Sequence, residues 1–212
     1  MEREQEVKMN KKLKDVKTLV ILGVMLAFTI ILDFTPLGAI PVFGVINATI
    51  NHLPTVVTGI ILGPIAGAII GASFGMVSLF HAVTRPNTIL APLFMNPLVS
   101  VLPRIFIGVM SYYGYVLFKK INKESKKVNV ISIFAAGVIG SLTNTILVLS
   151  MLYIVYNDKI EELLSSVPSM AGTSAKAFII GIGTTQGIGE SIVIGIIALP
   201  IVIAWQKTKK RV

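Results

Sequence analysis

Long apolar runs, broken by short charged segments, dominate the chain. The longest stretch without Asp, Glu, Lys or Arg extends over 51 residues, from Phe34 to Thr84. A helix needs about 20 mostly apolar residues to cross the hydrocarbon core of a bilayer, so this stretch is long enough for two spans. Gly63-Pro64 divides it, because proline fits the first turn of a helix but not its interior. The pattern therefore predicts two membrane-spanning helices joined by a very short turn.

The same criteria, applied to the whole chain, predict six spans. We place these at about 17–34, 44–62, 64–82, 96–119, 128–156 and 176–206. The predicted fold is an all-α membrane protein, a bundle of six transmembrane helices. We expect one domain over 1–212, with a basic segment at 1–16 and a basic tail at 207–212.

Composition and charge support a membrane protein. Hydrophobic residues make up 54% of the chain and charged residues only 14%, whereas soluble domains carry about 25% charged residues. This excludes a water-soluble enzyme. The net charge of +9 does not indicate a nucleic-acid partner, because fifteen of the nineteen Lys and Arg residues fall on one side of the predicted topology. The positive-inside rule places that side, and both termini, in the cytoplasm.

Three longer segments fall on the opposite, external side. They are Asp33 to Phe43, Ala82 to Met95 and Asn157 to Ala175. Each is longer than the usual connection between helices, and longer loops often carry binding residues. We therefore expect a pocket at the external face.

Charged side chains inside a span are costly and are candidates for function. Arg104 lies about seven residues into the fourth span, roughly 10 Å below the outer surface. Its planar guanidinium suits a carboxylate or a phosphate. An ion pair with Glu190, or a side chain that snorkels to the membrane interface, explains it equally well. Glu190 follows a glycine-rich segment at 181–189 that we expect to unwind or kink the last helix, and a purely structural role in the bundle stays open for it.

Other polar groups fall on different spans at similar depths. Asn51, His52 and Asn144 are predicted in the outer half of the membrane or near its middle, where they can converge on one ligand. The alternative for each is a buried group satisfied by a neighbouring helix. His81 and Arg85 are expected at the outer rim, where they attract an anion or are solvated. No catalytic or metal-binding motif appears, which disfavours an intramembrane enzyme.

Four segments, in chain order, resemble the substrate-binding (S) components of energy-coupling factor (ECF) vitamin transporters. They are Ile50–Val57 leading into Leu62-Gly63-Pro64, Pro103–Gly108, Gly140–Val148, and Gly187–Val193 with Gly189 where the family usually has proline. The resemblance extends over nearly the whole chain. It is closest to the pantothenate-type members.

The resemblance implies a multi-pass protein of a prokaryotic cell membrane that binds a vitamin from outside. It implies as partners a transmembrane coupling protein and two cytoplasmic ATPases, so that ATP is used by the partners and this chain needs no cofactor. Family members dock on the coupling protein through an A-x-x-x-A motif. The matching positions are Gly23 and Ala27, and small residues at this spacing let helices approach closely.

For pantothenate, Arg104 would bind the carboxylate, with Asn144, Asn51 and Gln186 as partners for amide and hydroxyl groups. The full set of candidate substrate-binding residues is Arg104, Asn144, Asn51, His52, Gln186, Glu190 and Arg85. Riboflavin, folate and pyridoxine remain alternative vitamins, although the only tryptophan, Trp205, is expected at the cytoplasmic end, away from a stacking role. A membrane scaffold that transports nothing is the alternative from another class.

Overall fold

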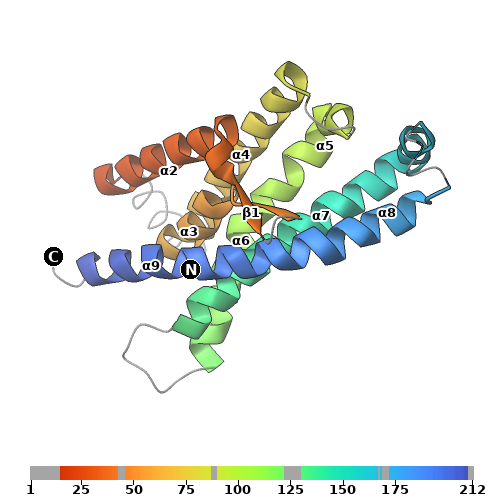
Figure 1. Cartoon of the computed structure of the whole chain (residues 1–212). Helices are drawn as coiled ribbons and strands as arrows, with labels where there is room; N and C mark the ends of the chain where they lie inside the picture. Colours follow the sequence, from red (N-terminus) through yellow and green to blue (C-terminus); the bar gives the residue numbers. More distant parts are fainter. Residues whose placement is uncertain are drawn as a thin grey trace, which may run out of the picture.

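The computed structural model describes residues 15–42, 46–86, 90–121, 130–166, 168 and 172–209. There the chain forms a bundle of helices around one small β-hairpin (Figure 1). The longer helices are α2 (Val16–Phe34), α3 (Leu53–Leu62), α4 (Pro64–Thr84), α6 (Leu102–Ile121), α7 (Val130–Ser165) and α9 (Ile188–Lys209). The shorter elements are η1 (Pro36–Gly38), β1 (Ala39–Val42), β2 (Ile46–Thr49), η2 (Ala91–Met95), α5 (Pro97–Ser100), α8 (Ala175–Ile182) and the π-helix η4 (Gly183–Gly187).

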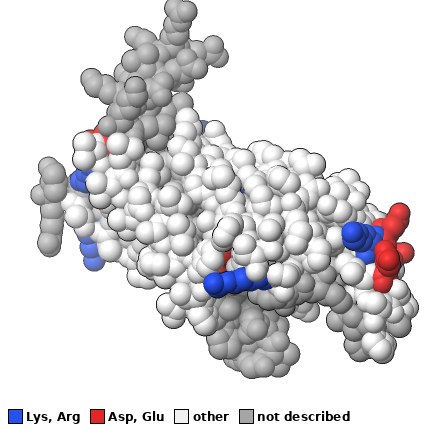
Figure 2. All heavy atoms as spheres, turned by 90° about the horizontal axis from the view of Figure 1, so that it is seen from above, with Lys and Arg blue, Asp and Glu red and all other residues white. Residues whose placement is uncertain are grey.

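Helices that are long and apolar enough to cross a membrane confirm a multi-pass membrane protein. In the described part of the chain there are five such stretches: Val16–Phe34, Pro64–Thr84, Pro97–Ile121, Val130–Ser165 and Ala175–Thr208. Figure 2 shows the corresponding surface, which is almost free of charged side chains between its two ends, apart from one small patch at the lower edge. The remaining apolar helix, α3, has only ten residues.

The expectation of one helix over 44–62 was wrong in its first half. Ile46–Thr49 is strand β2, which pairs antiparallel with β1 in the register Ala39↔Thr49, and the helix begins only at Leu53. The reason is Pro54 in its first turn, because proline is favoured at the start of a helix and disfavoured in its interior. The hairpin adds a β element to the predicted all-α fold and lies over the middle of the bundle (Figure 1).

The predicted break at Gly63-Pro64 is confirmed. Helix α3 ends at Leu62 and α4 begins at Pro64. Gly63 joins them with a φ of 110°, which residues with a side chain rarely adopt. Glycines also let α4 and α6 pack closely, since a Cβ added at Gly67 would lie 2.9 Å from the Cα of Gly108.

The glycine-rich segment before Glu190 distorts its helix, as expected. The helix does not break there; it widens into η4, and α8, η4 and α9 follow one another without a gap. Such π-helical turns are rare in proteins, and where they occur they are often part of a functional site. Helix α7 also departs from regular geometry at Tyr156 (φ −134°, ψ 24°), the residue at which the predicted fifth span ends.

Two clusters of buried apolar side chains form the core. One includes Val56, Phe74 and Ile107, and the other is built around Leu93 and Leu152. Arg104 lies between them. Its guanidinium carbon is 5.8 Å from the ring centre of Phe74 in the first cluster and 5.3 Å from that of Phe94, which packs against the second. The site described next lies at this junction.

Candidate functional site

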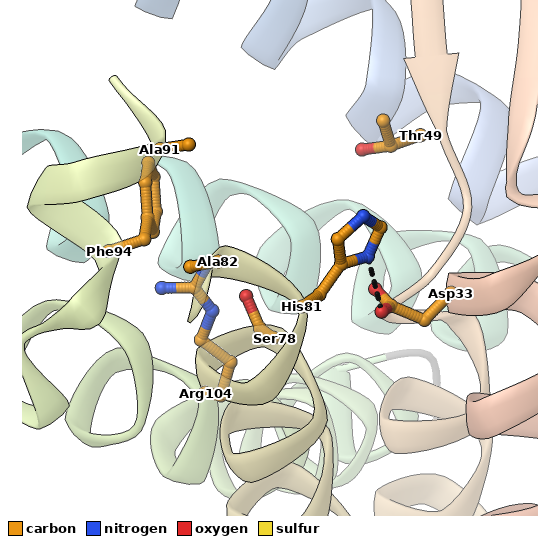
Figure 3. A pocket seen from close by; sticks show the side chains of 8 residues that line it. All are labelled: Asp33, Thr49, Ser78, His81, Ala82, Ala91, Phe94 and Arg104. Atoms are coloured by element: carbon orange, nitrogen blue, oxygen red, sulfur yellow. Dashed lines mark hydrogen bonds and ion pairs between the residues drawn. The ribbon is translucent and has the colours of Figure 1, made fainter. Parts of the chain in front are cut away.

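A cavity of about 300 Å³ lies at this junction of the two clusters. Its walls come from α2, β2, α4, η2 and α6, so five elements must pack together to form it (Figure 3). The lining residues are Asp33, Thr49, Ser78, His81, Ala82, Ala91, Phe94 and Arg104. Only Arg104 among them belongs to the set of binding residues predicted from the sequence.

Arg104 provides a buried cation on one wall. The residue is 6% exposed, and its Nη1 donates a hydrogen bond of 2.5 Å to the backbone carbonyl of Val99. Its Nε has no partner among the described residues. A guanidinium has five N–H donors, so donors remain for a ligand. Arg104 is therefore able to bind a carboxylate or a phosphate in the cavity.

The alternative pairing of Arg104 with Glu190 is not found. Within the described residues the recorded ion pair is between His81 and Asp33. Glu190 is 9% exposed, and its Oε1 accepts hydrogen bonds from the backbone N–H of Thr49 (3.0 Å) and from the Thr49 hydroxyl (2.9 Å). Glu190 thus ties the end of β2 to the first turn of α9, next to the cavity but not in its lining.

Asp33 and His81 form another wall of the cavity. From the sequence, His81 was expected at the outer rim, as a residue that attracts an anion or is solvated, and Asp33 was not singled out. The distance from His81 Nδ1 to Asp33 Oδ2 is 2.9 Å, and Asn51 Nδ2 donates to Asp33 Oδ1 at 3.3 Å. The Asp33 side chain is 7% exposed. A carboxylate in the last turn of a helix faces unpaired carbonyl groups, so these two donors offset an unfavourable position. One signal was available: Asp33 is the only acidic residue between Asp15 and Glu124.

The other predicted polar residues lie outside the cavity lining. His52 is 1% exposed, and its Nε2 is hydrogen-bonded to the Ser141 hydroxyl at 3.0 Å. Asn51 reaches the site through Asp33. The side-chain oxygens of Asn51 and Asn144 are buried without a partner among the described residues.

The remaining candidates are exposed. Gln186 is an exposed residue of η4, and Arg85, the residue after α4, lies over the ring of Phe34 at 5.4 Å. Gly23 and Ala27 are exposed on α2, and a Cβ added at Gly23 would meet no atom within 4 Å. In the described ranges, His52, His81 and Glu190 do not form a group that could hold a metal ion.

A second hollow, of about 460 Å³, lies between α7 and the α8–η4 segment. Apolar side chains such as Ile146, Leu149 and Ile180 line most of it, with Lys176 at one end. It shares no lining residue with the first cavity. Its one cation, Lys176, is exposed and lies among mainly apolar side chains, whereas Arg104 is a buried guanidinium with the hydroxyls of Thr49 and Ser78 in the same lining. The first cavity is therefore the better site for a small polar anion.

The comparisons with known proteins agree with this architecture. Residues 17–202 match the family described as "ECF transporter, substrate-specific component". The pantothenate transporter PanT of Leuconostoc mesenteroides is 29% identical over 115 residues, which cover 54% of each chain. The pantothenic acid transporter PanT of Lactococcus lactis is 27% identical over 133 residues, or 57% of this chain and 63% of the relative.

These matches to the two transporters span somewhat more than half the length of each relative. The family match is more extensive and includes every helix that contributes to the cavity. The chain therefore belongs to the family of substrate-specific components of ECF transporters.

Proposed function

We propose that this chain is the high-affinity pantothenate-binding subunit of an ATP-driven ECF vitamin importer in a prokaryotic cell membrane. Its two curated relatives are named for pantothenate transport. Pantothenate carries a carboxylate at one end, an amide in the middle and hydroxyl groups at the other end. The cavity offers a cation on one wall and hydrogen-bonding groups on the others.

The observation that carries the proposal is the incomplete partnering of Arg104. A buried guanidinium with one backbone carbonyl as its recorded hydrogen-bond partner, beside a cavity, is poorly compensated for the loss of water. A ligand carboxylate would supply the missing charge and acceptors. A volume of about 300 Å³ is at the small end of ligand pockets, which suits a metabolite of this size.

The other candidates have supporting roles in this proposal. Asn51 and Asn144 each hold a buried oxygen without a partner among the described residues, which can accept a hydrogen bond from an amide or a hydroxyl. His52 and Glu190 act through Ser141 and Thr49, which they hold in place. Arg85 and Gln186 are exposed and would attract the anion or contact it on entry.

The proposed topology has six spans in one domain, with both termini in the cytoplasm. Helix α3, with ten residues, is only about 15 Å long and cannot cross the bilayer alone. The β-hairpin and the turn at Asn51-His52 would complete this crossing on the outer side. Strands β1 and β2 pair antiparallel with each other, which satisfies part of their backbone polar groups.

Coupling to ATP is proposed to occur through α2. Gly23 and Ala27 present a smooth, exposed strip four residues apart, on which a helix of the transmembrane coupling protein can pack. The two cytoplasmic ATPases would use the ATP, and this chain would bind no cofactor and no nucleic acid.

Calorimetric titration of the purified protein with pantothenate tests the proposal. We expect tight binding by the wild type and a loss of about a hundredfold in Arg104→Ala, because two charge-assisted hydrogen bonds are removed. Arg104→Lys should keep part of the affinity, since it retains the charge but not the planar fork. Lys159→Ala removes an exposed cation outside the cavity and should bind like the wild type.

Parallel titrations with riboflavin, folate and pyridoxine separate the alternatives. Tight binding of one of these in place of pantothenate would reassign the vitamin, and no binding of any would favour a scaffold. If Arg104→Ala binds pantothenate as tightly as the wild type, the assignment of the carboxylate site is wrong.

A further inference from the structure

The cavity wall opposite Arg104 carries the Asp33–His81 ion pair. Figure 3 shows the Arg104 guanidinium on one side of the cavity and the His81 imidazole on the other, with Ser78 between them. We infer that the Asp33–His81 pair is a hydroxyl-binding subsite, so that the preferred ligands are organic anions with a hydroxyl group at the end remote from the carboxylate. This inference rests on the proposed function and adds a specificity determinant to it.

The hydrogen bond to Asp33 orients the imidazole. A carboxylate only accepts hydrogen bonds, so Nδ1 of His81 carries the hydrogen that it donates to Asp33 at 2.9 Å. The other ring nitrogen, Nε2, points away from Asp33 toward the space below Thr49 (Figure 3). The ring also stacks on Phe34, with 6.0 Å between centres and 23° between planes. His81 is thus held with Nε2 toward the cavity, and this nitrogen has no hydrogen-bond partner among the described residues.

The chemistry of this nitrogen selects a hydroxyl. When His81 is neutral, Nε2 accepts a hydrogen bond, and when it is charged, Nε2 donates one. A hydroxyl group can both donate and accept, so it fits either state. A ligand carboxylate fits only the charged state, and the Asp33 carboxylate beside the ring would repel it.

Charge therefore fixes the direction in which a ligand lies. The anion is attracted to Arg104, whose only hydrogen-bond acceptor among the described residues is the Val99 carbonyl. It is repelled from the opposite wall, where Asp33 already has His81 and Asn51 as donors. The hydroxyl end is left for His81. In this arrangement His81 contacts the ligand, and Asp33 is a positioning residue.

A comparison of two ligands measures the subsite directly. The first ligand is pantothenate and the second is N-(3,3-dimethylbutanoyl)-β-alanine, which has the same skeleton without the hydroxyls. The wild type should bind pantothenate at least about tenfold more tightly, as expected for one well-made hydrogen bond. His81→Phe, which keeps the ring on Phe34, should bind the two ligands equally by weakening pantothenate alone.

Two more variants complete the design. Asp33→Asn should reduce the preference for pantothenate over the analogue, because an amide holds the imidazole tautomer less firmly than a carboxylate does. This variant replaces His81→Phe in the test if His81→Phe does not fold. Thr84→Val is the control, since Thr84 is an exposed residue at the same end of α4 whose hydroxyl bonds only to Phe80 in its own helix. It should keep the full preference.

The outcomes separate the subsite from the proposed function. If the wild type prefers pantothenate and both His81→Phe and Asp33→Asn keep that preference, the subsite is wrong and the proposed function stands. If His81→Phe weakens both ligands equally, the pair only joins α2 to α4 and the inference is overturned. If the wild type binds neither ligand, the proposed function fails and the subsite with it.

Discussion

Individual charged residues were predicted as candidates when they interrupt an apolar span. Arg104 was found in this way, and the structure places it in the wall of the cavity. Asp33 was not, because a charge at the end of a span is ordinary in membrane proteins. Its partner His81 is 48 residues further along the chain, and only the packing of α2 against α4 brings the two together. Sequence patterns reveal a costly charge but not the group that compensates it.

For Glu190, too, the sequence revealed the buried charge but not the group that it contacts. Its position in an apolar span suggested either ligand binding or a pair with Arg104, and the glycines before it suggested a distorted helix. The distortion is present as η4. The hydrogen-bond partner is Thr49, 141 residues away, in a strand that the hydrophobic pattern did not predict.

The hydrogen bond between His52 and Ser141 provides a test at the residue scale. Ser141→Ala leaves the buried His52 Nε2 without its 3.0 Å partner, which should lower the free energy of unfolding by about 1–3 kcal/mol. Thermal unfolding in detergent measures this. Ser73→Ala is the matched control, because the exposed Ser73 hydroxyl bonds only to Ile69 in its own helix. Equal melting temperatures for the two variants would show that the His52–Ser141 contact is not stabilising.

Secondary-structure elements were predicted well where proline and glycine mark them. The break between α3 and α4 at Gly63 follows from local backbone chemistry and was confirmed. The β-hairpin was missed because its strands have four residues each and belong to the same uncharged run as the following helix. Helix periodicity cannot separate such short strands from a helix. Thr49 enters the cavity wall through this hairpin.

Close contact between α4 and α6 yields a test at the element scale. A Cβ at Gly108 would lie 2.5 Å from the Cα of Gly67, and backbone atoms cannot rotate away. Gly108→Ala should therefore destabilise the bundle by about 1–3 kcal/mol or more. Gly189→Ala is the matched control, since a Cβ there meets no atom within 4 Å and alanine favours a helix. Unfolding in denaturant should give a higher free energy of unfolding for Gly189→Ala than for Gly108→Ala. The reverse order would contradict the close packing of α4 and α6.

At the scale of the whole molecule, the apolar spans and the distribution of charged residues are the features that the sequence predicts. Its multi-pass character was predicted from the apolar runs, and the described part of the chain has five helices long and apolar enough to cross a membrane. The number of crossings depends on α3, which is too short to cross by itself. The cavity was not predictable as a whole, because its eight lining residues lie on five elements.

Single-cysteine labelling tests the six-span topology. Because the sequence contains no cysteine, each variant carries one reactive thiol at a known position. Asp15→Cys and Lys207→Cys should react with a membrane-impermeant maleimide only after cells are permeabilised. Asp158→Cys should react in intact cells. All three positions are exposed. Labelling of Asp15→Cys and Lys207→Cys from opposite sides would mean an odd number of spans.

Docking of this subunit on the coupling protein is tested by placing a large side chain on the exposed strip of α2 formed by Gly23 and Ala27. Ala27→Phe should leave pantothenate affinity unchanged, because Ala27 lies outside the cavity, while abolishing uptake and co-purification with the coupling protein. Ala177→Phe makes the same change at an exposed alanine of α8 and should remain active. Normal uptake by Ala27→Phe would rule out this docking face.

A structure of the protein with bound pantothenate is the decisive test of the proposed binding site. We expect the ligand in the cavity between α2, α4 and α6, with its carboxylate within hydrogen-bonding distance of the Arg104 guanidinium and a hydroxyl on Nε2 of His81. Pantothenate in the hollow between α7 and α8, or in the cavity with its carboxylate remote from Arg104, would contradict it.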